Sequence, residues 1–286
     1  MTILSSHRTK GILQRLLTIG RERLQETLAL SMRQFLQIKR RPSSFVVGVI
    51  QPLIWLILFS ALFSNAPKGF LPYSMGYGHF ITAGLIVFTA FSGALNAGLP
   101  VMFDREFGFL NRILVAPLRS RSSVVLASVV HIGAISLIQS IFIMIAAGLL
   151  GYGWPSGLGA LTTLTTLSIL TIGVTALSLG LAFALPGHIE LLAITFLINL
   201  PLLFSSTALA PLEFMPVILR WLACLNPLTY AIEPIRAAYQ GPVDLGTVVL
   251  HAPYGDVSSG TCIWILLTLT IATLILVRPL LHRKLS

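Results

Sequence analysis

The chain has 286 residues and a formal net charge of +10; 55% of its residues are apolar and only 10% are charged. A soluble domain normally carries about 25% charged residues, so most of this chain cannot face water and lipid is its natural solvent. Nucleic-acid binding explains the positive charge poorly, because the basic residues are distributed as in a membrane protein.

Residues 1–43 are predicted to form a cytoplasmic tail that ends in an amphipathic helix. Between residues 22 and 40 the apolar side chains recur at steps of three and four, at Leu24, Leu28, Met32, Phe35 and Leu36. An apolar stripe with basic flanks beside a span is typical of a helix in the membrane interface. Pro42 marks the start of the first span. A solvated helical tail is the alternative.

Six apolar stretches without charges follow, each near the length of about 20 residues that a helix needs to cross about 30 Å of hydrocarbon. They are Ser44–Ser64, His79–Met102, Val124–Leu150, Leu158–Leu185, Leu191–Ala210 and Val257–Val277. None shows the alternation of a membrane β-strand. The sequence therefore predicts an all-α integral membrane protein, with six transmembrane helices in residues 44–286.

A charged segment, FDREFGFLNRILVAPLRSR at residues 103–121, separates the second and third stretches. We expect a short helix that starts near Asp104, because acids favour a helix N-terminus, and that ends at Pro117. One face of this helix could rest in a groove of another protein, through Leu110, Ile113 and Leu114. An ordinary solvated loop and a helix lying on the bilayer are the alternatives.

Few polar side chains lie within the predicted spans. Each is expected to make an interhelical hydrogen bond rather than to bind a ligand: Asn96, His131, Gln139 and Asn199. The two asparagines are accompanied by aromatic residues of the second and fifth spans, Phe88, Phe91, Phe196 and Phe204. These aromatic side chains could line a transport route or pack in the core.

Residues 211–241 are too apolar for a loop, but prolines and charged residues stop them from crossing the membrane as one helix. They are predicted to form two short re-entrant helices, broken at Asn226–Pro227, in the outer half of the membrane. Such backbone is tolerated only where protein or a water-filled cavity covers it. A pair of amphipathic helices on the surface is the alternative.

The two cysteines, Cys224 and Cys262, are expected on the same, non-cytoplasmic side. They could pair there, but two free buried thiols are the preferred interpretation, because Cys224 lies in an apolar helix. No CxxC motif or Cys/His cluster suggests a metal site.

The basic residues predict the orientation. Six spans place 16 of the 19 Lys and Arg residues on one side of the membrane and three on the other. The positive-inside rule makes the richer side the cytoplasm, with both termini and residues 103–121 there. The expected location is the plasma (inner) membrane, or else an organellar membrane.

The sequence lacks the chemistry of an ATPase. None of its four lysines lies in a Gly-x-x-x-x-Gly-Lys-Ser/Thr loop. No Asp or Glu lies within a predicted span to act as a protease acid or a proton relay. An intramembrane enzyme and a proton-coupled carrier are therefore poorly supported.

Three motifs resemble the permease subunits of type-two ABC exporters. The first resembles the family's acid-x-acid-x-Gly motif and the Leu-Leu-Val-Thr-Pro-Leu run that follows it, at Glu106, Gly108, Leu114, Val115, Pro117, Leu118 and Arg119; Phe109, Asn111 and Ala116 depart from that pattern. The first span resembles the family's at Gln51–Pro52. Residues 226–230 resemble its Asn-Pro-Leu-Thr-Tyr signature, followed by Arg236. The motifs occur in the family's order over nearly the whole chain.

The resemblance implies a permease that dimerises, as a homodimer or with a paralogue, and that binds two copies of an ABC ATP-binding subunit. That subunit would bind ATP and Mg, so this chain would have no catalytic residue, cofactor or metal of its own. Residues 103–121 would form the coupling helix, with contacts from Arg105, Glu106, Gly108, Leu110, Arg112, Ile113, Leu114 and Pro117. The interfacial helix would lie beside the same subunit, with Arg33, Phe35 and Arg41.

The resemblance also implies an outer gate and a route through the membrane. The re-entrant helices would form the gate, with Asn226, Pro227, Tyr230 and Arg236. The second and fifth spans would line the route, with Phe88, Phe91, Asn96, Phe196, Asn199 and Phe204. The implied function is ATP-driven export of an amphipathic, lipid-linked or glycan substrate. A membrane scaffold that docks an ATPase without transport, a channel and a secondary carrier are the alternatives.

Overall fold

The computed structural model describes residues 42–65, 76–108 and 121–285. Its longer helices are α2 (Pro42–Leu62), α3 (Tyr77–Leu95), α6 (Arg121–Leu149), α7 (Gly157–Ala184), α8 (His188–Phe204) and α11 (Ser259–Leu285), with the short α4 (Gly98–Glu106) after α3. The predicted interfacial helix, with Arg33, Phe35 and Arg41, lies outside the described residues.

The prediction of an all-α integral membrane protein is confirmed. In the described ranges, five segments are long and apolar enough to cross a membrane: Phe45–Leu62, Tyr77–Glu106, Val130–Leu149, Gly157–Ala184 and Ser259–Leu280. Helix α8 has 17 residues, a length of about 25 Å at 1.5 Å per residue, which is shorter than the other spans. The count of six transmembrane helices therefore stays a prediction.

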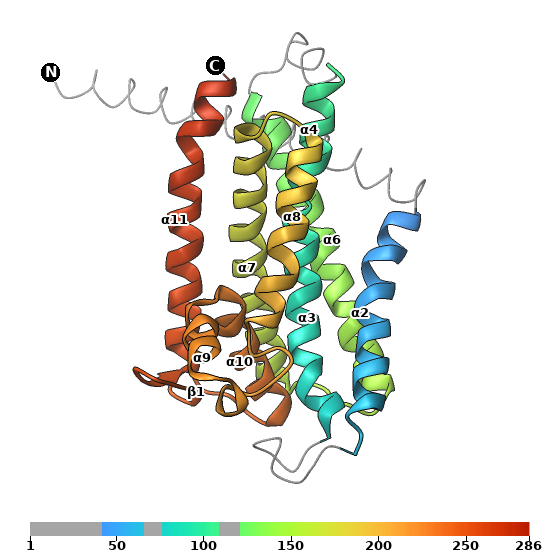
Figure 1. Cartoon of the computed structure of the whole chain (residues 1–286), viewed down its shortest axis with the longest axis vertical. Helices are drawn as coiled ribbons and strands as arrows, with labels where there is room; N and C mark the ends of the chain where they lie inside the picture. Colours follow the sequence, from blue (N-terminus) through green and yellow to red (C-terminus); the bar gives the residue numbers. More distant parts are fainter. Residues whose placement is uncertain (1–41, 66–75, 109–120, 286) are drawn as a thin grey trace, which may run out of the picture.

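The long helices stand side by side in one bundle (Figure 1). Helix α4 and the last turns of α11 lie at one end, which we call the C-terminal end. Helices α9 and α10 and strand β1 lie at the opposite end, which we call the hairpin end.

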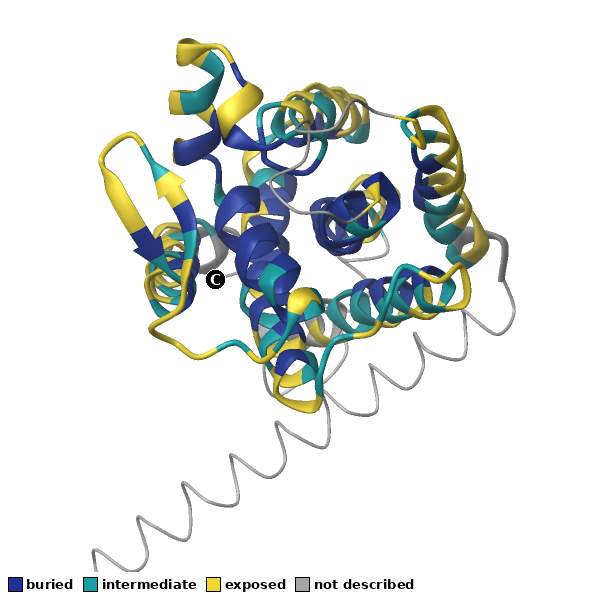
Figure 2. Cartoon of the chain, turned by 90° about the horizontal axis from the view of Figure 1, so that it is seen from below, coloured by how far each residue is buried: buried dark blue, intermediate teal, exposed yellow. Residues whose placement is uncertain are grey.

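Helix α3 lies at the centre of the bundle, and the other long helices surround it (Figure 2). Most of its side chains are buried, and it contacts α2, α6, α7 and α10. Small residues allow this close packing: a Cβ on Gly84 would lie 2.7 Å from the Cα atom of Ala208, in the turn after α8. By contrast, only 17% of the span in α2 and 22% of the span in α11 are buried, as expected of helices that face lipid or another subunit.

The second predicted span is present, but its helix has a break that the sequence did not indicate. Helix α3 ends at Leu95 and α4 begins at Gly98. The hydroxyl of Ser178 in α7 donates a hydrogen bond to the carbonyl of Leu95, at 2.5 Å, and accepts one from the amide of Gly98, at 2.8 Å. A side chain inserted into the backbone hydrogen bonds is a known cause of helix breaks, so Ser178 stabilises the break.

The hairpin end contains the 3-10 turn η1 (Leu212–Phe214), α9 (Val217–Leu225), α10 (Pro227–Gln240) and the antiparallel strands β1 (Val248–Ala252) and β2 (Gly255–Ser258). Two short helices meet at Asn226, as the sequence predicted; their depth in a membrane stays a prediction. The β-hairpin was not predicted. Val257 pairs with Leu250 in it, so the last helix starts at Ser259 and not at Val257.

Candidate functional site

Arg105 joins α4 to the end of α7 at the C-terminal end of the bundle. Its guanidinium donates hydrogen bonds to the carbonyls of Ala182, Leu185 and Pro186, at 2.8, 2.6 and 2.7 Å. The last carbonyls of a helix have no partner within the helix, and a cation near them is favoured by the helix dipole. Arg105 therefore holds α4 against the connection between α7 and α8.

Glu106 makes the corresponding contact to the start of α8. One carboxylate oxygen accepts a hydrogen bond from the backbone amide of His188 at 3.2 Å, and the other pairs with the ring Nδ1 of His188. A Cβ on Gly187 would lie 2.7 Å from this carboxylate, so glycine makes room for it. We call Arg105, Glu106 and the connection Leu185–His188 the latch.

The structure corrects the predicted start of the coupling helix, which was expected near Asp104. Asp104, Arg105 and Glu106 lie in the last turn of α4, and not in the first turn of a new helix. Gly108 follows with a φ of +71°, a conformation that glycine adopts at little cost. The remaining predicted coupling residues lie outside the described part of the chain: Leu110, Arg112, Ile113, Leu114 and Pro117.

At the hairpin end, Asn226 connects α10 to the end of α8. Its Oδ1 accepts a hydrogen bond from the amide of Leu228 at 2.9 Å, as expected of a helix-capping residue. Its Nδ2 donates to the carbonyl of Leu202 at 2.6 Å and to the hydroxyl of Ser205 at 3.1 Å. Pro227 occupies the first position of α10, where a missing amide hydrogen costs nothing.

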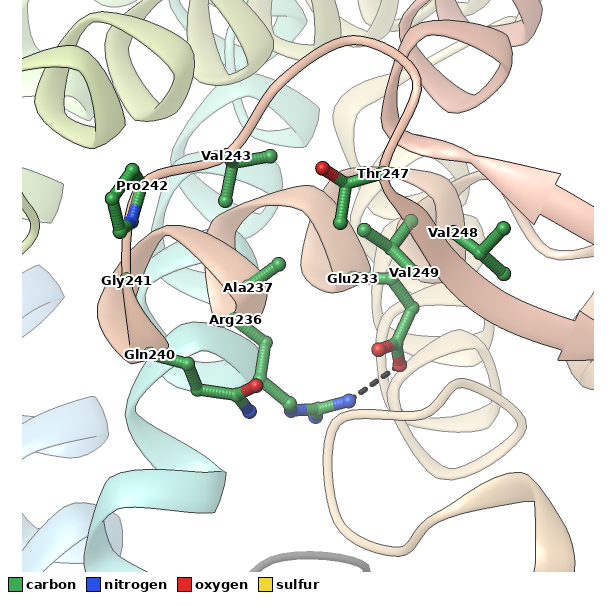
Figure 3. Close-up of a pocket in the computed structure, with 10 residues that line it drawn as sticks. All are labelled: Glu233, Arg236, Ala237, Gln240, Gly241, Pro242, Val243, Thr247, Val248 and Val249. Carbon is green, nitrogen blue, oxygen red and sulfur yellow. Dashed lines mark hydrogen bonds and ion pairs between the residues drawn. The ribbon is translucent and has the colours of Figure 1, made fainter.

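Arg236 forms a buried ion pair with Glu233, one turn earlier in α10 (Figure 3). Its guanidinium also donates to the carbonyl of Thr207 at 2.6 Å and to that of Phe80 at 3.4 Å. Burying two charges is tolerated when they are paired and hydrogen-bonded. Arg236 thus joins three segments: α10, α3 and the turn after α8. Beside the pair, a cavity of about 320 Å³ lies between α10, residues 241–247 and the start of β1.

Tyr230 connects the two short helices to the hairpin. Its hydroxyl donates a hydrogen bond to the carbonyl of Cys224 at the end of α9, and it also pairs with the hydroxyl of Tyr254, at 2.7 Å, between β1 and β2. Burial is the main cause that raises the pKa of Tyr230, so its hydroxyl stays protonated. The four predicted gate residues therefore all lie in one region, with Asn226, Tyr230 and Arg236 each hydrogen-bonded to a different neighbouring segment.

The six predicted route residues do not share one surface. Phe88 and Phe91 are buried within the chain, and Phe88 stacks on Trp55 with ring centroids 5.7 Å apart. Phe196 and Phe204 are exposed on α8. Within this chain Phe88 and Phe91 pack in the core, and the role of these residues in a transport route stays a prediction.

The polar residues of the spans partly follow their prediction. Asn199 of α8 donates to the hydroxyl of Ser92 in α3 at 3.1 Å, and Gln139 of α6 donates to the carbonyl of Phe45 in α2 at 3.2 Å. These are interhelical hydrogen bonds, as expected. Asn96 donates to the carbonyl of Ser92 in its own helix segment, so its expected interhelical bond is not found there.

Three residues that the sequence did not indicate complete these contacts: Ser178 at the α3–α4 break, Thr207 beside Arg236 and Tyr254 beside Tyr230. No spacing distinguishes Ser178 from the other hydroxyl residues of α7. The β-branched run before Pro253–Tyr254–Gly255 was a usable signal for a hairpin.

The two cysteines are free and buried, as the sequence predicted. Within the described ranges, no three His, Cys, Asp or Glu side chains gather in a way that could hold a metal ion.

Comparisons with known proteins match most of the chain. The model of the family described as ABC-2 type transporter matches residues 25–239. The putative transport permease ycf38 of Porphyra purpurea is 49% identical over 266 residues, covering 93% of this chain and 91% of that protein. Its counterpart in Cyanophora paradoxa is 52% identical over 216 residues, covering 76% and 74%. The probable doxorubicin resistance ABC transporter permease protein DrrC of Mycobacterium tuberculosis is 24% identical over 224 residues, covering 76% and 78%.

Proposed function

Since the chain belongs to the ABC-2 type transporter family, as a multi-pass transport permease, we propose that it is the membrane subunit of an ATP-driven exporter. Two copies of a separate ABC ATP-binding subunit bind ATP and Mg and hydrolyse the ATP. The permease works as a dimer, with itself or with a paralogue. Both termini and residues 103–121 face the cytoplasm, of which the distribution of basic residues is the support.

The latch is the observation that carries this proposal. Residues 109–120, the proposed docking segment, follow α4 in the chain after Phe107 and Gly108. A displacement of that segment by an ATP-binding subunit acts on α4, whose last turn is hydrogen-bonded to the end of α7 and the start of α8. Charge-assisted hydrogen bonds hold their geometry better than apolar contacts. The docking movement is therefore passed to two membrane helices through Arg105 and Glu106.

The contacts at the hairpin end extend the same movement to the proposed outer gate. The end of α8 is hydrogen-bonded to Asn226, and the turn that follows it is bonded to Arg236. A tilt of α8 would thus displace α10 near both of its ends, through Asn226 and Arg236. In this proposal Tyr230 couples α10 to the hairpin. The gate at the hairpin end therefore opens when the helices at the C-terminal end move together.

The proposed cargo is an amphipathic, lipid-linked or glycan molecule. The exposed apolar face of α8, with Phe196 and Phe204, suits a cargo that keeps part of its surface in lipid. A relative named for doxorubicin resistance supports a cargo that is a small organic molecule.

Reconstitution tests the proposal. The permease is co-expressed with ABC ATP-binding subunits of its source genome, and the complex that co-purifies is placed in liposomes. We expect ATP hydrolysis together with movement of a fluorescent amphipath, both stopped by vanadate. A docked subunit without movement would indicate a scaffold, and movement without ATP would indicate a channel or a secondary carrier.

A further inference from the structure

A cavity of about 380 Å³ lies between α2, α3 and α6, away from the latch and the gate residues. Hydrogen-bonding side chains are frequent in its wall: Gln51, Ser92, Asn96, His131, Ser136 and Gln139. Such groups are expensive within a membrane bundle unless they have partners, and so many around one cavity require an explanation.

Two glycines make room for the polar groups of α6. A Cβ on Gly48 of α2 would overlap the side-chain amide of Gln139, and a Cβ on Gly93 of α3 would lie 2.5 Å from the hydroxyl of Ser136. Any larger residue at these positions would displace a polar side chain from the wall. The backbone of α2 and α3 is thus shaped around these groups.

The wall retains unused hydrogen-bonding capacity. The hydroxyl of Ser136 is fully buried and has no hydrogen-bond partner in the described part of the chain. Gln139 uses its amide nitrogen to donate to the carbonyl of Phe45 at 3.2 Å, and its amide oxygen can accept a further hydrogen bond. A buried polar group without a partner is costly, and a ligand that supplies hydrogen bonds removes that cost.

The wall also restricts the charge of a ligand. Among the described residues that line the cavity, none is Asp, Glu, Lys or Arg. A phosphate or sulfate would therefore be buried without a cation, whereas hydroxyl groups both donate and accept hydrogen bonds, as the amides and hydroxyls of the wall do. The volume is at the lower end of small-molecule sites, about 300–1,000 Å³.

The cavity is connected both to lipid and to α8. On the α2 side, the neighbouring Val46, Val47 and Ile50 are exposed, so an attached apolar chain can stay in the bilayer. On the other side, Ser92 of the wall accepts the hydrogen bond from Asn199 of α8. A ligand in the cavity would therefore lie beside Ser92, which is bonded to α8. In the proposed function, α8 is one of the two helices to which Arg105 and Glu106 pass the docking movement.

We propose that this cavity binds the uncharged, hydroxyl-bearing headgroup of a membrane amphipath, and that this amphipath is the cargo. The second half of the statement rests on the proposed export function; the binding site does not. Ser136 and Gln139 hold the headgroup by hydrogen bonds, Asn96 lies at the α3–α4 break beside it, and the apolar chain lies along α2.

Binding is measured with the purified permease in lipid nanodiscs, without any ATP-binding subunit. The probes are radiolabelled dodecyl glucoside and dodecyl phosphate, which share the chain and differ in headgroup charge. We expect saturable binding of the glucoside and at least tenfold weaker binding of the phosphate. Equal affinity for the two probes, or no saturable binding of the glucoside, would overturn the proposal.

Substitutions locate the site. Ser136→Leu fills the cavity and Gln139→Leu removes its amide, so each should weaken glucoside binding about tenfold. Ser140→Ala is the matched control, because Ser140 is buried on the same helix but does not line the cavity, and its hydroxyl donates only to the backbone carbonyls of Ile86 and Ser136; it should leave binding unchanged. Asn96→Lys adds a cation and should raise the affinity for dodecyl phosphate, which a misfolded variant could not do.

The outcomes separate this site from the proposed function. Unchanged glucoside binding in both Ser136→Leu and Gln139→Leu, or an equal loss in Ser140→Ala, would reject the cavity as the site, whereas ATP-driven movement of another amphipath would still stand. Conversely, a permease that binds the glucoside as expected but never binds an ATP-binding subunit would retain the site and lose the export function.

Discussion

The guanidinium of Arg236 lies over the ring of Phe80, with its central carbon 3.9 Å from the ring centroid. A planar guanidinium can stack on an aromatic face and donate in several directions at once, which a lysine ammonium cannot do in the same way. This contact joins α10 at the hairpin end to α3, the central helix. Arg236 is therefore as much a structural residue as a proposed gate residue.

Replacing Arg236 should destabilise the protein strongly. Arg236→Met leaves the buried carboxylate of Glu233 without its partner, and breaking a buried pair in this way costs about 3–5 kcal/mol. The thermal unfolding midpoint in detergent should fall accordingly. The double variant Glu233→Gln/Arg236→Met removes both charges and should recover a large part of the loss. If single and double variants unfold at the same temperature, the ion pair does not contribute in this way.

Arg105 should be needed for coupling and not for docking. Arg105→Ala removes three hydrogen bonds to carbonyls at the end of α7, so the last turn of α4 no longer holds that helix. We expect the ATP-binding subunit to co-purify as before, while ATP-driven movement falls at least tenfold.

Arg220 provides the matched control for this variant. It also donates to three carbonyls, those of Leu212, Glu213 and Met215, but at the hairpin end. Arg220→Ala should leave coupling nearly unchanged. Equal losses of movement in both variants would show that the effect reflects general destabilisation and not the latch.

The sequence predicted the membrane helices, which follow from the apolar lipid around them, and one helix boundary. Charge-free stretches identified the starts of the long helices to within three residues, because lipid excludes charged side chains from such helices. The ends of α3, α8 and α11 lie six to eight residues from the predicted ones. The break at Asn226–Pro227 was also predictable, since asparagine caps a helix and proline starts one. Both signals are local, so they can be recognised without knowing what packs against them.

Contacts between distant segments were not predictable. Arg105 and Glu106 were expected to serve a docking helix, yet they bond to residues about 80 positions later in the chain. Similarly, the break after Leu95 depends on Ser178 of another helix. The hairpin was missed because Val248–Ala252 were assigned to no element and Val257 of β2 was read as the start of the last span. Such features depend on tertiary partners that a single sequence does not reveal.

Cys224 should react slowly with thiol reagents in the folded protein. The thiolate is the reactive form, and burial raises the pKa of the Cys224 thiol above its ordinary value. At pH 8 its thiolate fraction is therefore lower than that of an exposed cysteine, and labelling should accelerate as the pH rises. Denaturation in dodecyl sulfate should make both cysteines react fully. Fast labelling of the native protein at pH 7 would contradict the burial of this thiol.

The proposed orientation predicts which introduced cysteines are accessible from outside. In a variant without native cysteines, Ser258→Cys at the end of β2 should react with a membrane-impermeant reagent in intact cells. Cysteines at Ser43, Ser120 and Ser286 should react only after the membrane is opened. Labelling of Ser120→Cys from outside would reverse the assigned orientation.

The docking role of residues 109–120 gives the last prediction. Leu114 is expected on the apolar face that contacts the ATP-binding subunit. Burying a leucine contributes about 1.5–3 kcal/mol, and Leu114→Asp also places a charge in the contact. Affinity for the subunit should therefore fall by about a hundredfold or more, and ATP turnover in the complex and transport should be lost together.

Two variants at the hairpin end distinguish docking from general damage. Leu245→Asp makes the same substitution at an exposed leucine, so it should keep the subunit bound, with full ATP turnover. Tyr230→Ala removes the hydrogen bonds to Cys224 and Tyr254; it should keep the subunit bound and slow only transport, because Tyr230 and the latch lie at opposite ends of the bundle. Co-purification of the subunit with each variant, measured together with ATP turnover in lipid, distinguishes a loss of docking from general damage to the permease. A Leu114→Asp permease that retains the subunit with normal turnover would mean that residues 109–120 are an ordinary loop, and that the latch transmits no signal from a docked partner.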